Sequence, residues 1–176
     1  SGPLMRSYHH ISVDRANGEQ SYRDAVDLAR GGEIVGIFPE ATISRSFEIK
    51  ELKTGAVRMA AEAGVPLIPM VTWGTQLLKT KDHDGDMWGR GKTIGLHVGE
   101  PLNVTGEDPV AETRRLREAM SALLDHAIEQ YPVSPEGQWW APARHGGTAP
   151  SLEEAKRMDD EEYAARAARR AEKEQS

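Results

Sequence analysis

Residues 38–46 hold the densest group of side chains in this sequence that could do chemistry. They read Phe-Pro-Glu-Ala-Thr-Ile-Ser-Arg-Ser, so a carboxylate, a guanidinium and several hydroxyls follow one another closely. Hydroxyls, backbone N–H groups and an arginine suit the binding of an anion such as a phosphate ester. The same residues are also compatible with a polar, capped turn that follows a strand and binds nothing.

The residues just before this segment indicate where it would lie in a fold. Residues 33–38 favour a buried strand, and Pro39 should end it because proline cannot donate a hydrogen bond to a strand ladder. Ligands of α/β proteins usually bind beyond the carboxyl ends of strands. We therefore expect residues 39–46 at an edge of a sheet, where a binding site could form.

Hydrophobic periodicity, glycines and prolines divide the chain into alternating elements. The expected helices cover residues 20–30, 50–63 and 109–130. The expected strands cover residues 10–14, 33–38, 65–72 and 93–98. This order predicts an α/β fold: a single domain built on a mixed, largely parallel sheet flanked by helices, with a polar C-terminal tail.

Composition along the chain predicts its organisation. Residues 1–131 should form the α/β domain, residues 132–150 a loop rich in proline and glycine, and residues 151–176 a polar tail that is helical or disordered. The loop contains Trp139 and Trp140. Indoles of this kind either sit at a membrane interface or pin a loop onto its domain, and we favour the second interpretation.

Overall composition excludes several classes of function. The chain has 176 residues and no cysteine, which rules out disulfides, thiolate metal sites and a cysteine nucleophile. Its net charge of −6 argues against nucleic-acid binding, which calls for a basic excess. No metal site is expected, because no histidine has a partner at a spacing typical of metal ligands. The chain opens Ser-Gly-Pro-Leu without an initiator methionine, so we expect it to be part of a longer protein.

Three segments together resemble the motifs of the glycerolipid acyltransferase family, whose members acylate glycerol 3-phosphate and 1-acylglycerol 3-phosphate. Residues 13–15, Val-Asp-Arg, resemble the motif in which a strand ends in an apolar residue, Asp and Arg. Residues 38–44 resemble the family's Phe-Pro-Glu-Gly-Thr-Arg-Ser. Residues 65–70, Val-Pro-Leu-Ile-Pro-Met, resemble its Val-Pro-Ile-Ile-Pro-Val. The order and spacing of the motifs agree with the family, and on this resemblance residues 1–131 are the C-terminal portion of its domain.

The resemblance implies an enzyme of phospholipid biosynthesis, similar to 1-acylglycerol-3-phosphate O-acyltransferases. Such an enzyme moves a fatty acyl group from an acyl thioester, acyl-CoA or acyl-carrier protein, to the hydroxyl of lysophosphatidate, and needs no other cofactor. Its partners are the lysophospholipid acceptor, the thioester donor and a membrane surface, with no nucleic acid. The implied location is peripheral, at the cytoplasmic face of the membrane. A non-catalytic α/β module that binds anionic lipid or phosphate remains the alternative.

The same resemblance implies a set of substrate-binding residues. Arginine suits a phosphate monoester, because its planar fork donates two parallel hydrogen bonds. Ile43 stands where the family has arginine, and we expect Arg45 to supply that charge instead. The candidate substrate-binding residues are Arg15, Glu40, Thr42, Ser44 and Arg45.

The catalytic residues remain unknown. The family uses His-x-x-x-x-Asp, in which the histidine takes the proton of the attacking hydroxyl and the aspartate orients the ring. His9 and Asp14 have this spacing, but Asp14 already belongs to the Asp-Arg motif. Five steps along an alternating strand also place the two on opposite faces. The family's pair lies far upstream of Phe-Pro-Glu, so we expect the true pair to precede Ser1.

Overall fold

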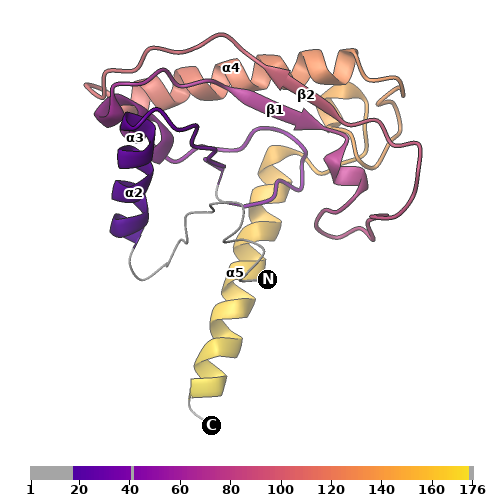
Figure 1. The fold of residues 1–176 in the computed structure, drawn as a ribbon. Coiled ribbons are helices and arrows are strands. Elements are labelled where there is room, and N and C mark those ends of the chain that lie inside the picture. Colours follow the sequence, from indigo (N-terminus) through magenta and orange to yellow (C-terminus); the bar gives the residue numbers. More distant parts are fainter. Residues whose placement is uncertain (1–17, 41, 175–176) are drawn as a thin grey trace. The chain divides into compact units, whose positions relative to one another are not determined.

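The computed structural model describes residues 18–40 and 42–174 and shows a mixed α/β protein (Figure 1). Its elements are α2 (Gly18–Arg30), α3 (Gly55–Ala63), β1 (Met70–Trp73), the 3-10 turn η1 (Thr75–Leu77), β2 (Gly95–Val98), α4 (Pro109–Glu129), the 3-10 turn η2 (Ala143–His145) and α5 (Leu152–Glu174). The chain forms two compact units, and each unit is made of several separate stretches of the sequence.

The first unit comprises Ser1–Ala41, Leu52–Pro69 and Gly99–Ala119, and in its described part α2 packs against α3. The two helices meet through small side chains, since Val26 is 1% exposed and Val57 is fully buried. Short apolar side chains at a helix contact let the two backbones approach closely. The contact is completed at its rim, where the Tyr22 hydroxyl donates a hydrogen bond to Glu62 at 2.8 Å.

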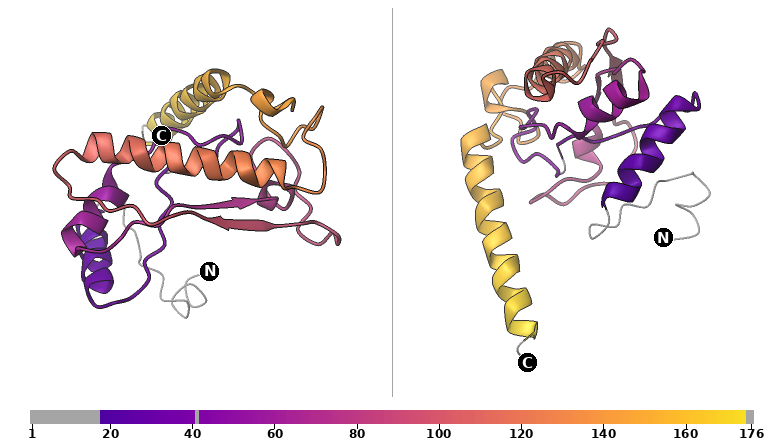
Figure 2. Two further views of the ribbon diagram at one scale, coloured as in Figure 1. Left: turned by 90° about the horizontal axis from the view of Figure 1, so that it is seen from above. Right: turned by 90° about the vertical axis from the view of Figure 1, so that its left-hand side faces the viewer.

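The second unit comprises Thr42–Glu51, Met70–Val98 and Met120–Ser176, and its described core lies around β1 and β2. These strands pair antiparallel, with Met70 opposite Val98 and Trp73 opposite Gly95. Within this unit the C-terminal half of α4 lies along the strands (Figure 2), and His126 of α4 contacts the ring of His97 on β2.

An aromatic cluster closes the second unit's core. The Trp73 ring lies 6.2 Å from that of Trp140 and 6.5 Å from that of Tyr131, measured between centroids. The Tyr131 hydroxyl donates to the Thr93 carbonyl at 2.9 Å, so the polar end of that side chain is satisfied. Trp140 is only 5% exposed. This packing agrees with the interpretation that the tryptophan pair pins the 132–150 loop onto its domain.

The helix predictions largely agree with the structure. α2 and α4 cover the expected ranges, and the Asp108 side chain caps α4 by accepting a hydrogen bond from the Ala111 N–H at 3.0 Å. α3 begins at Gly55, five residues later than expected, because residues 50–53 have no regular structure and the Lys53 N–H donates to the Pro39 carbonyl. The helix ends where expected, at Gly64 in the left-handed conformation.

The strand predictions fared less well. The expected strands at residues 65–72 and 93–98 overlap β1 and β2, but residues 10–14 lie outside the described residues. Residues 33–38 were expected as a buried strand, and this is wrong: they have no regular structure, with Ile34 99% and Phe38 93% exposed. A strand exists only where a neighbour takes its backbone hydrogen bonds, and no described segment pairs with these residues. The α/β class is confirmed; the largely parallel sheet is not, since β1 and β2 run antiparallel.

The C-terminal segment is helical as far as the structure describes it. α5 presents a narrow stripe toward the rest of its unit: Leu152, Ala155, Met158, Asp159 and Glu162. Only Ala155 and Asp159 in this stripe are buried, at 2% and 4% exposed. The residues of α5 beyond Glu162 whose burial is described are all exposed. The helix is therefore attached through its first half.

Candidate functional site

The loop at residues 42–51 is shaped by its own side chains. Ser46 is fully buried, and its hydroxyl oxygen accepts a hydrogen bond from the Glu48 N–H at 3.3 Å. The hydroxyls of Ser44 and Ser46 lie 3.0 Å apart. Phe47 adopts a left-handed backbone conformation with φ of 56°, unusual for a residue with a Cβ, and its ring lies 6.2 Å from that of Trp139. Serine hydroxyls thus hold a turn here, as such residues commonly do.

The guanidinium of Arg45 forms the centre of an ionic cluster. It donates to Asp82 at 2.8 Å and to Glu162 at 2.7 Å. Its Nε lies 3.3 Å from an oxygen of Asp159, within ion-pair distance but without a hydrogen bond. The Arg45 side chain is only 8% exposed, so its charge is shielded from water by these carboxylates.

Two lysines complete the cluster around α5. The Lys50 ammonium donates to Asp159 and, at 2.8 Å, to the Thr42 hydroxyl. The Lys81 ammonium donates to Asp159 at 2.9 Å and to Glu162 at 3.4 Å. We refer to Arg45, Lys50, Lys81, Asp82, Asp159 and Glu162 as the Arg45 cluster.

The cations of the Arg45 cluster determine the ionisation of its buried acid. Burial of Asp159 opposes its ionisation, but the hydrogen bonds from Lys50 and Lys81 outweigh this, so the pKa of Asp159 is lowered from its ordinary value. The pKa of Glu162 is lowered as well, with Lys81 the main stabilising charge against the opposing effect of burial. Both carboxyls are therefore ionised at neutral pH.

The structure brings together only part of the predicted binding set. Thr42 and Arg45 both contact members of the Arg45 cluster, whereas the Ser44 hydroxyl faces Ser46. Glu40 is half-buried in the first unit. Arg15 lies outside the described residues, as do His9 and Asp14. Whether these residues bind a substrate stays a prediction.

Sequence reasoning missed much of the Arg45 cluster. Neither Lys50 nor Lys81 is among the candidate binding residues predicted from the sequence, yet both bind Asp159. The acidic members had one local signal: Asp159 and Glu162 continue the spacing of Leu152 and Ala155 and so share their face of a helix. No local pattern indicates that this face meets the loop at residues 42–51.

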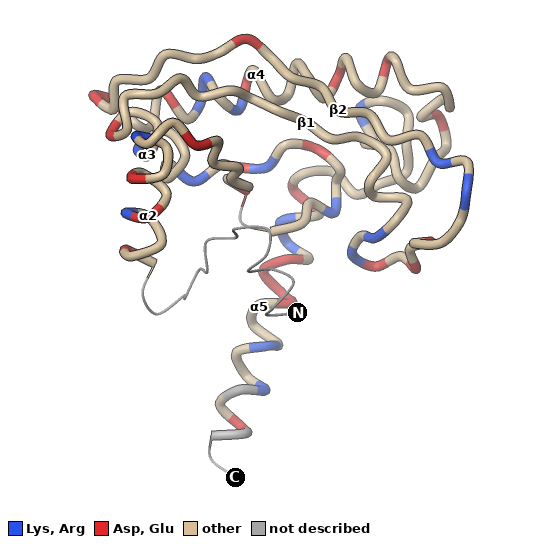
Figure 3. The backbone as a smooth tube through the Cα atoms, viewed as in Figure 1, with Lys and Arg blue, Asp and Glu red and all other residues tan. Residues whose placement is uncertain are grey.

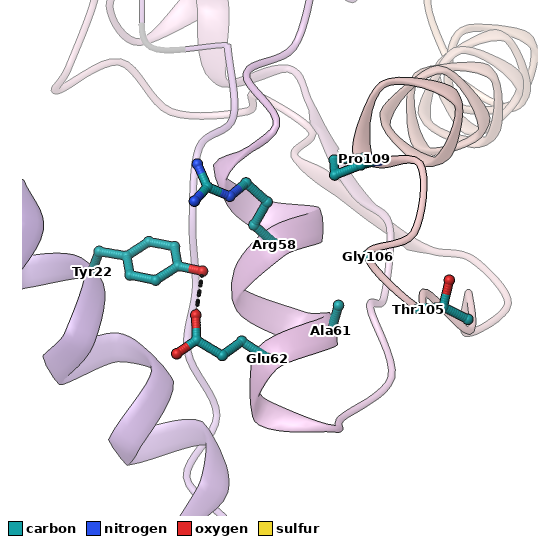
Figure 4. A pocket seen from close by; sticks show the side chains of 7 residues that line it. All are labelled: Tyr22, Arg58, Ala61, Glu62, Thr105, Gly106 and Pro109. Carbon is teal, nitrogen blue, oxygen red and sulfur yellow. Dashed lines mark hydrogen bonds between the residues drawn. The ribbon is translucent and has the colours of Figure 1, made fainter.

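A separate pocket of about 270 Å³ lies in the first unit (Figure 4). It is lined by Tyr22, Arg58, Ala61, Glu62, Thr105, Gly106 and Pro109. The Arg58 guanidinium lies 5.8 Å from the centre of the Tyr22 ring. Burial and the hydrogen bond to Glu62 raise the pKa of the Tyr22 hydroxyl, which keeps it protonated. Of the predicted substrate-binding residues that the structure describes, none lines this pocket.

Charge is finely mixed along the chain. Figure 3 shows acidic and basic positions interspersed through both units, including along α5. In the part of the chain that the structure describes, no three His, Cys, Asp or Glu side chains are grouped as metal ligands would be. Within the same residues, no helix is long and apolar enough to cross a membrane.

Comparison with known proteins points to one group. Residues 1–73 match the family model described as acyltransferase. The 1-acyl-sn-glycerol-3-phosphate acyltransferase of Bacillus subtilis (strain 168) is 34% identical over 130 residues, which cover 73% of this chain and 60% of that protein. The enzyme of the same name from Haemophilus influenzae is 31% identical over 129 residues, covering 68% of this chain and 52% of that protein. The chain thus spans only about half to three-fifths of these relatives.

One solved structure shares the fold. The crystal structure of the 1-acyl-sn-glycerophosphate acyltransferase PlsC from Thermotoga maritima superposes with a TM-score of 0.54. The match covers 66% of this chain and 48% of that one, at 21% sequence identity. At that identity the likeness concerns the fold alone.

Proposed function

We propose that the protein transfers a fatty acyl group from an acyl thioester to the hydroxyl of 1-acylglycerol 3-phosphate, because residues 1–73 match the family model described as acyltransferase. The observation that carries the proposal is the 34% identity over 130 residues to a relative with that activity. The Phe-Pro-Glu-Ala-Thr-Ile-Ser segment, which resembles a family motif, supports it independently. The reaction is a step of phospholipid biosynthesis.

The proposed chemistry is the transfer of an acyl group from the thioester sulfur to the acceptor hydroxyl oxygen. The acceptor hydroxyl oxygen bonds to the thioester carbonyl carbon, the C–S bond breaks, and the thiol leaves after a base has taken the hydroxyl proton. Arg15 and Arg45 bind the acceptor phosphate in this proposal, with Thr42 and Ser44 donating hydroxyl hydrogen bonds. Glu40 would be repelled by a phosphate, so we assign it to the glycerol hydroxyls. The donor is an acyl thioester of CoA or of acyl-carrier protein.

The proposal is tested by following thiol release from acyl-CoA. The assay uses the protein expressed from its complete reading frame, with and without lysophosphatidate. We expect release that depends on the acceptor, with a product one acyl chain heavier by mass spectrometry. Release that ignores the acceptor, or no release at all, would contradict the proposal.

His9 provides a sharper test of where the base lies. The sequence argument places the catalytic pair elsewhere, so His9→Ala should leave acceptor-dependent thiol release within about two-fold of the unmodified protein, well short of the loss of roughly 10²-fold or more that follows removal of a general base. His10→Ala is the matched control, since it removes a neighbouring imidazole. Loss of release in the His9 variant alone would show that His9 and Asp14 are the pair after all.

The second candidate function is a non-catalytic module that binds anionic lipid or phosphate. The observation that favours it is the convergence of Arg45, Lys50 and Lys81 on one point of the second unit. Such a module would bind lysophosphatidate with the same affinity in the presence and absence of acyl-CoA. It would release no thiol from acyl-CoA. The assay above separates the two.

Association with a membrane surface completes the proposal, because the acceptor is a lipid. The loop at residues 80–92 is suited to this contact, since Trp88 is 94% and Met87 60% exposed. Indole rings favour the interface between headgroups and acyl chains. We place the protein as a peripheral enzyme at the cytoplasmic face.

A further inference from the structure

Three cations of the Arg45 cluster face the two carboxylates that α5 contributes, with Asp82 as the third acid. Arg45, Lys50 and Lys81 converge on a single buried carboxylate, that of Asp159, whose side chain is 6% exposed. The Thr42 hydroxyl joins them through Lys50. One donor remains unsatisfied, since the buried Arg45 Nε makes no hydrogen bond within the described residues. Buried N–H groups of this kind are usually paired.

A phosphate monoester can engage the same donors as the two carboxylates of α5. It carries up to two negative charges and three terminal oxygens, whereas each carboxylate brings one charge and two oxygens. Arginine and lysine together recognise phosphate, the first by its planar fork and the second as a point charge. The carboxylates of Asp159 and Glu162 therefore stand where a phosphate would be bound.

The attachment of α5 is weak enough in apolar terms to be reversible. Of its inward stripe, Leu152 and Met158 are only half-buried and Ala155 offers a single methyl group. Hydrophobic stabilisation scales with the apolar area removed from water, so little of it holds this helix. The ion pairs of Asp159 and Glu162 carry most of the attachment, and an anion that competes for the same cations would loosen it.

We propose that α5 is an intramolecular competitor, in which Asp159 and Glu162 occupy an anion site formed by Arg45, Lys50 and Lys81 and leave it when a phosphate monoester binds. The inference rests on the proposed function for the identity of that ligand, the phosphate end of the lipid acceptor. It makes α5 a regulatory element, because acceptor binding must supply the free energy that displaces the helix.

The test compares two charge-matched double variants of the whole chain. Asp159→Asn with Glu162→Gln removes the competing carboxylates; Asp160→Asn with Glu153→Gln makes the same chemical changes on the exposed side of α5. Binding of inorganic phosphate and of glycerol 3-phosphate is measured by isothermal titration calorimetry at low salt. If the site is free about a tenth of the time in the unmodified protein, the first variant binds roughly ten-fold more tightly. The second variant should match the unmodified protein.

Hydrogen exchange on the unmodified protein gives a readout that does not depend on any variant folding. Saturating glycerol 3-phosphate should speed amide exchange in residues 155–163, because the released helix loses its packing. Unchanged exchange with bound ligand would overturn the proposal, and so would equal affinities of the two variants or no binding by either probe. In that case the Arg45 cluster serves only to hold α5.

The two ligands and the thiol-release assay keep this inference separate from the proposed function. Tighter binding of both inorganic phosphate and glycerol 3-phosphate by the first variant, without any acyl transfer, would retain the competitor and reject the enzyme. Acyl transfer together with equal phosphate affinities of the two variants would retain the enzyme and reject the competitor. Tighter binding of glycerol 3-phosphate alone by the first variant would support both the competitor and the enzyme.

Discussion

At the scale of single residues, Arg45 contacts all three acids of the Arg45 cluster. It ties the 42–51 loop to Asp82 and to two acids of α5. The ion pairs with these carboxylates offset the desolvation free energy of the buried Arg45 charge, and removing them would leave it uncompensated. A residue in this position is needed for the structure whether or not it also binds substrate.

Replacing Arg45 by alanine should therefore be costly. Asp159 would keep Lys50 and Lys81, so we expect a loss of about 2–3 kcal/mol in the free energy of unfolding, somewhat below that of a fully broken buried ion pair. Urea unfolding followed by circular dichroism measures it. Arg157→Ala is the control, since Arg157 is 72% exposed beside Glu161 and should change stability by less than about 0.5 kcal/mol. Equal effects of the two substitutions would contradict this assignment.

At the scale of elements, α3 shows how its termination depends on one residue. Gly64 has φ of 70°, a conformation that places any Cβ in strain, while Gly55 at the other end has no such constraint. No atom lies within 4 Å of a Cβ built at either glycine, so the two sites differ in backbone conformation and not in space. Conformation alone should decide the outcome of substitution.

We predict that Gly64→Ala lowers the free energy of unfolding by about 1 kcal/mol. Gly55→Ala should be neutral or stabilise by up to about 1 kcal/mol, because alanine favours the helix and restricts the unfolded chain. Urea titrations of both variants and the unmodified protein provide the comparison. The explanation fails if the two alanines act alike.

The attachment of α5 should depend on pH through Asp159. A carboxyl with a lowered pKa in the folded state adds stability above its unfolded pKa, and that stability is lost as pH falls toward the folded pKa. The unfolded pKa of aspartate is about 3.9, so the free energy of unfolding should fall steadily below about pH 4. The cations that face Asp159 are Arg45, Lys50 and Lys81.

Asp159→Asn should flatten this acid dependence without abolishing it. The pKa of Asp125 is lowered too, since its hydrogen bonds to Arg144 and His145 outweigh the effect of burial, and this contribution stays in the variant. Urea unfolding between pH 7 and pH 3, or hydrogen exchange of α5 over that range, gives the measurement, with Asp160→Asn as the exposed control. A slope below pH 4 that is identical in both variants would remove Asp159 from the explanation.

The elements also show which features a sequence can predict. α2 and α4 were found from hydrophobic spacing, because helices depend on contacts three or four residues apart. Residues 33–38 have a strand-like pattern, but a strand also needs a neighbour that its own sequence does not specify. The pairing of Lys81 with Asp159 spans 78 residues, so no local pattern could reveal it. The Phe-Pro-Glu segment was recognisable because its chemistry lies in consecutive positions.

At the scale of the whole molecule, the proposed enzyme must reach a lipid acceptor. The exposed Trp88 and Met87 lie in the 80–92 loop together with Arg90, a cation suited to anionic headgroups. Trp139 and Trp140 are less suited to this contact: the Trp139 ring stacks on His83 at 4.0 Å, and Trp140 belongs to the aromatic cluster. A membrane contact, the alternative not favoured for the tryptophan pair in the sequence analysis, is better placed at Trp88.

Trp88→Ala should weaken binding to vesicles of phosphatidylglycerol and phosphatidylcholine by roughly three- to ten-fold, the effect of removing one large apolar side chain from the interface. Co-sedimentation with the vesicles measures the bound fraction. Tyr163→Ala is the control, because Tyr163 is also an exposed aromatic residue, 52% accessible, but lies on α5. Equal losses in both variants, or none in either, would rule out the loop as the point of contact.

The division of the chain into two units has a practical optical consequence. All four tryptophans of the sequence (Trp73, Trp88, Trp139 and Trp140) fall in the second unit, so indole fluorescence observes that unit alone. The buried pair, Trp73 and Trp140, should emit toward the blue, and the water-exposed Trp88 toward the red. A spectral shift on adding ligand or lipid would therefore report changes around β1, the loops and α5, whereas changes in the helices of the first unit would give no tryptophan signal.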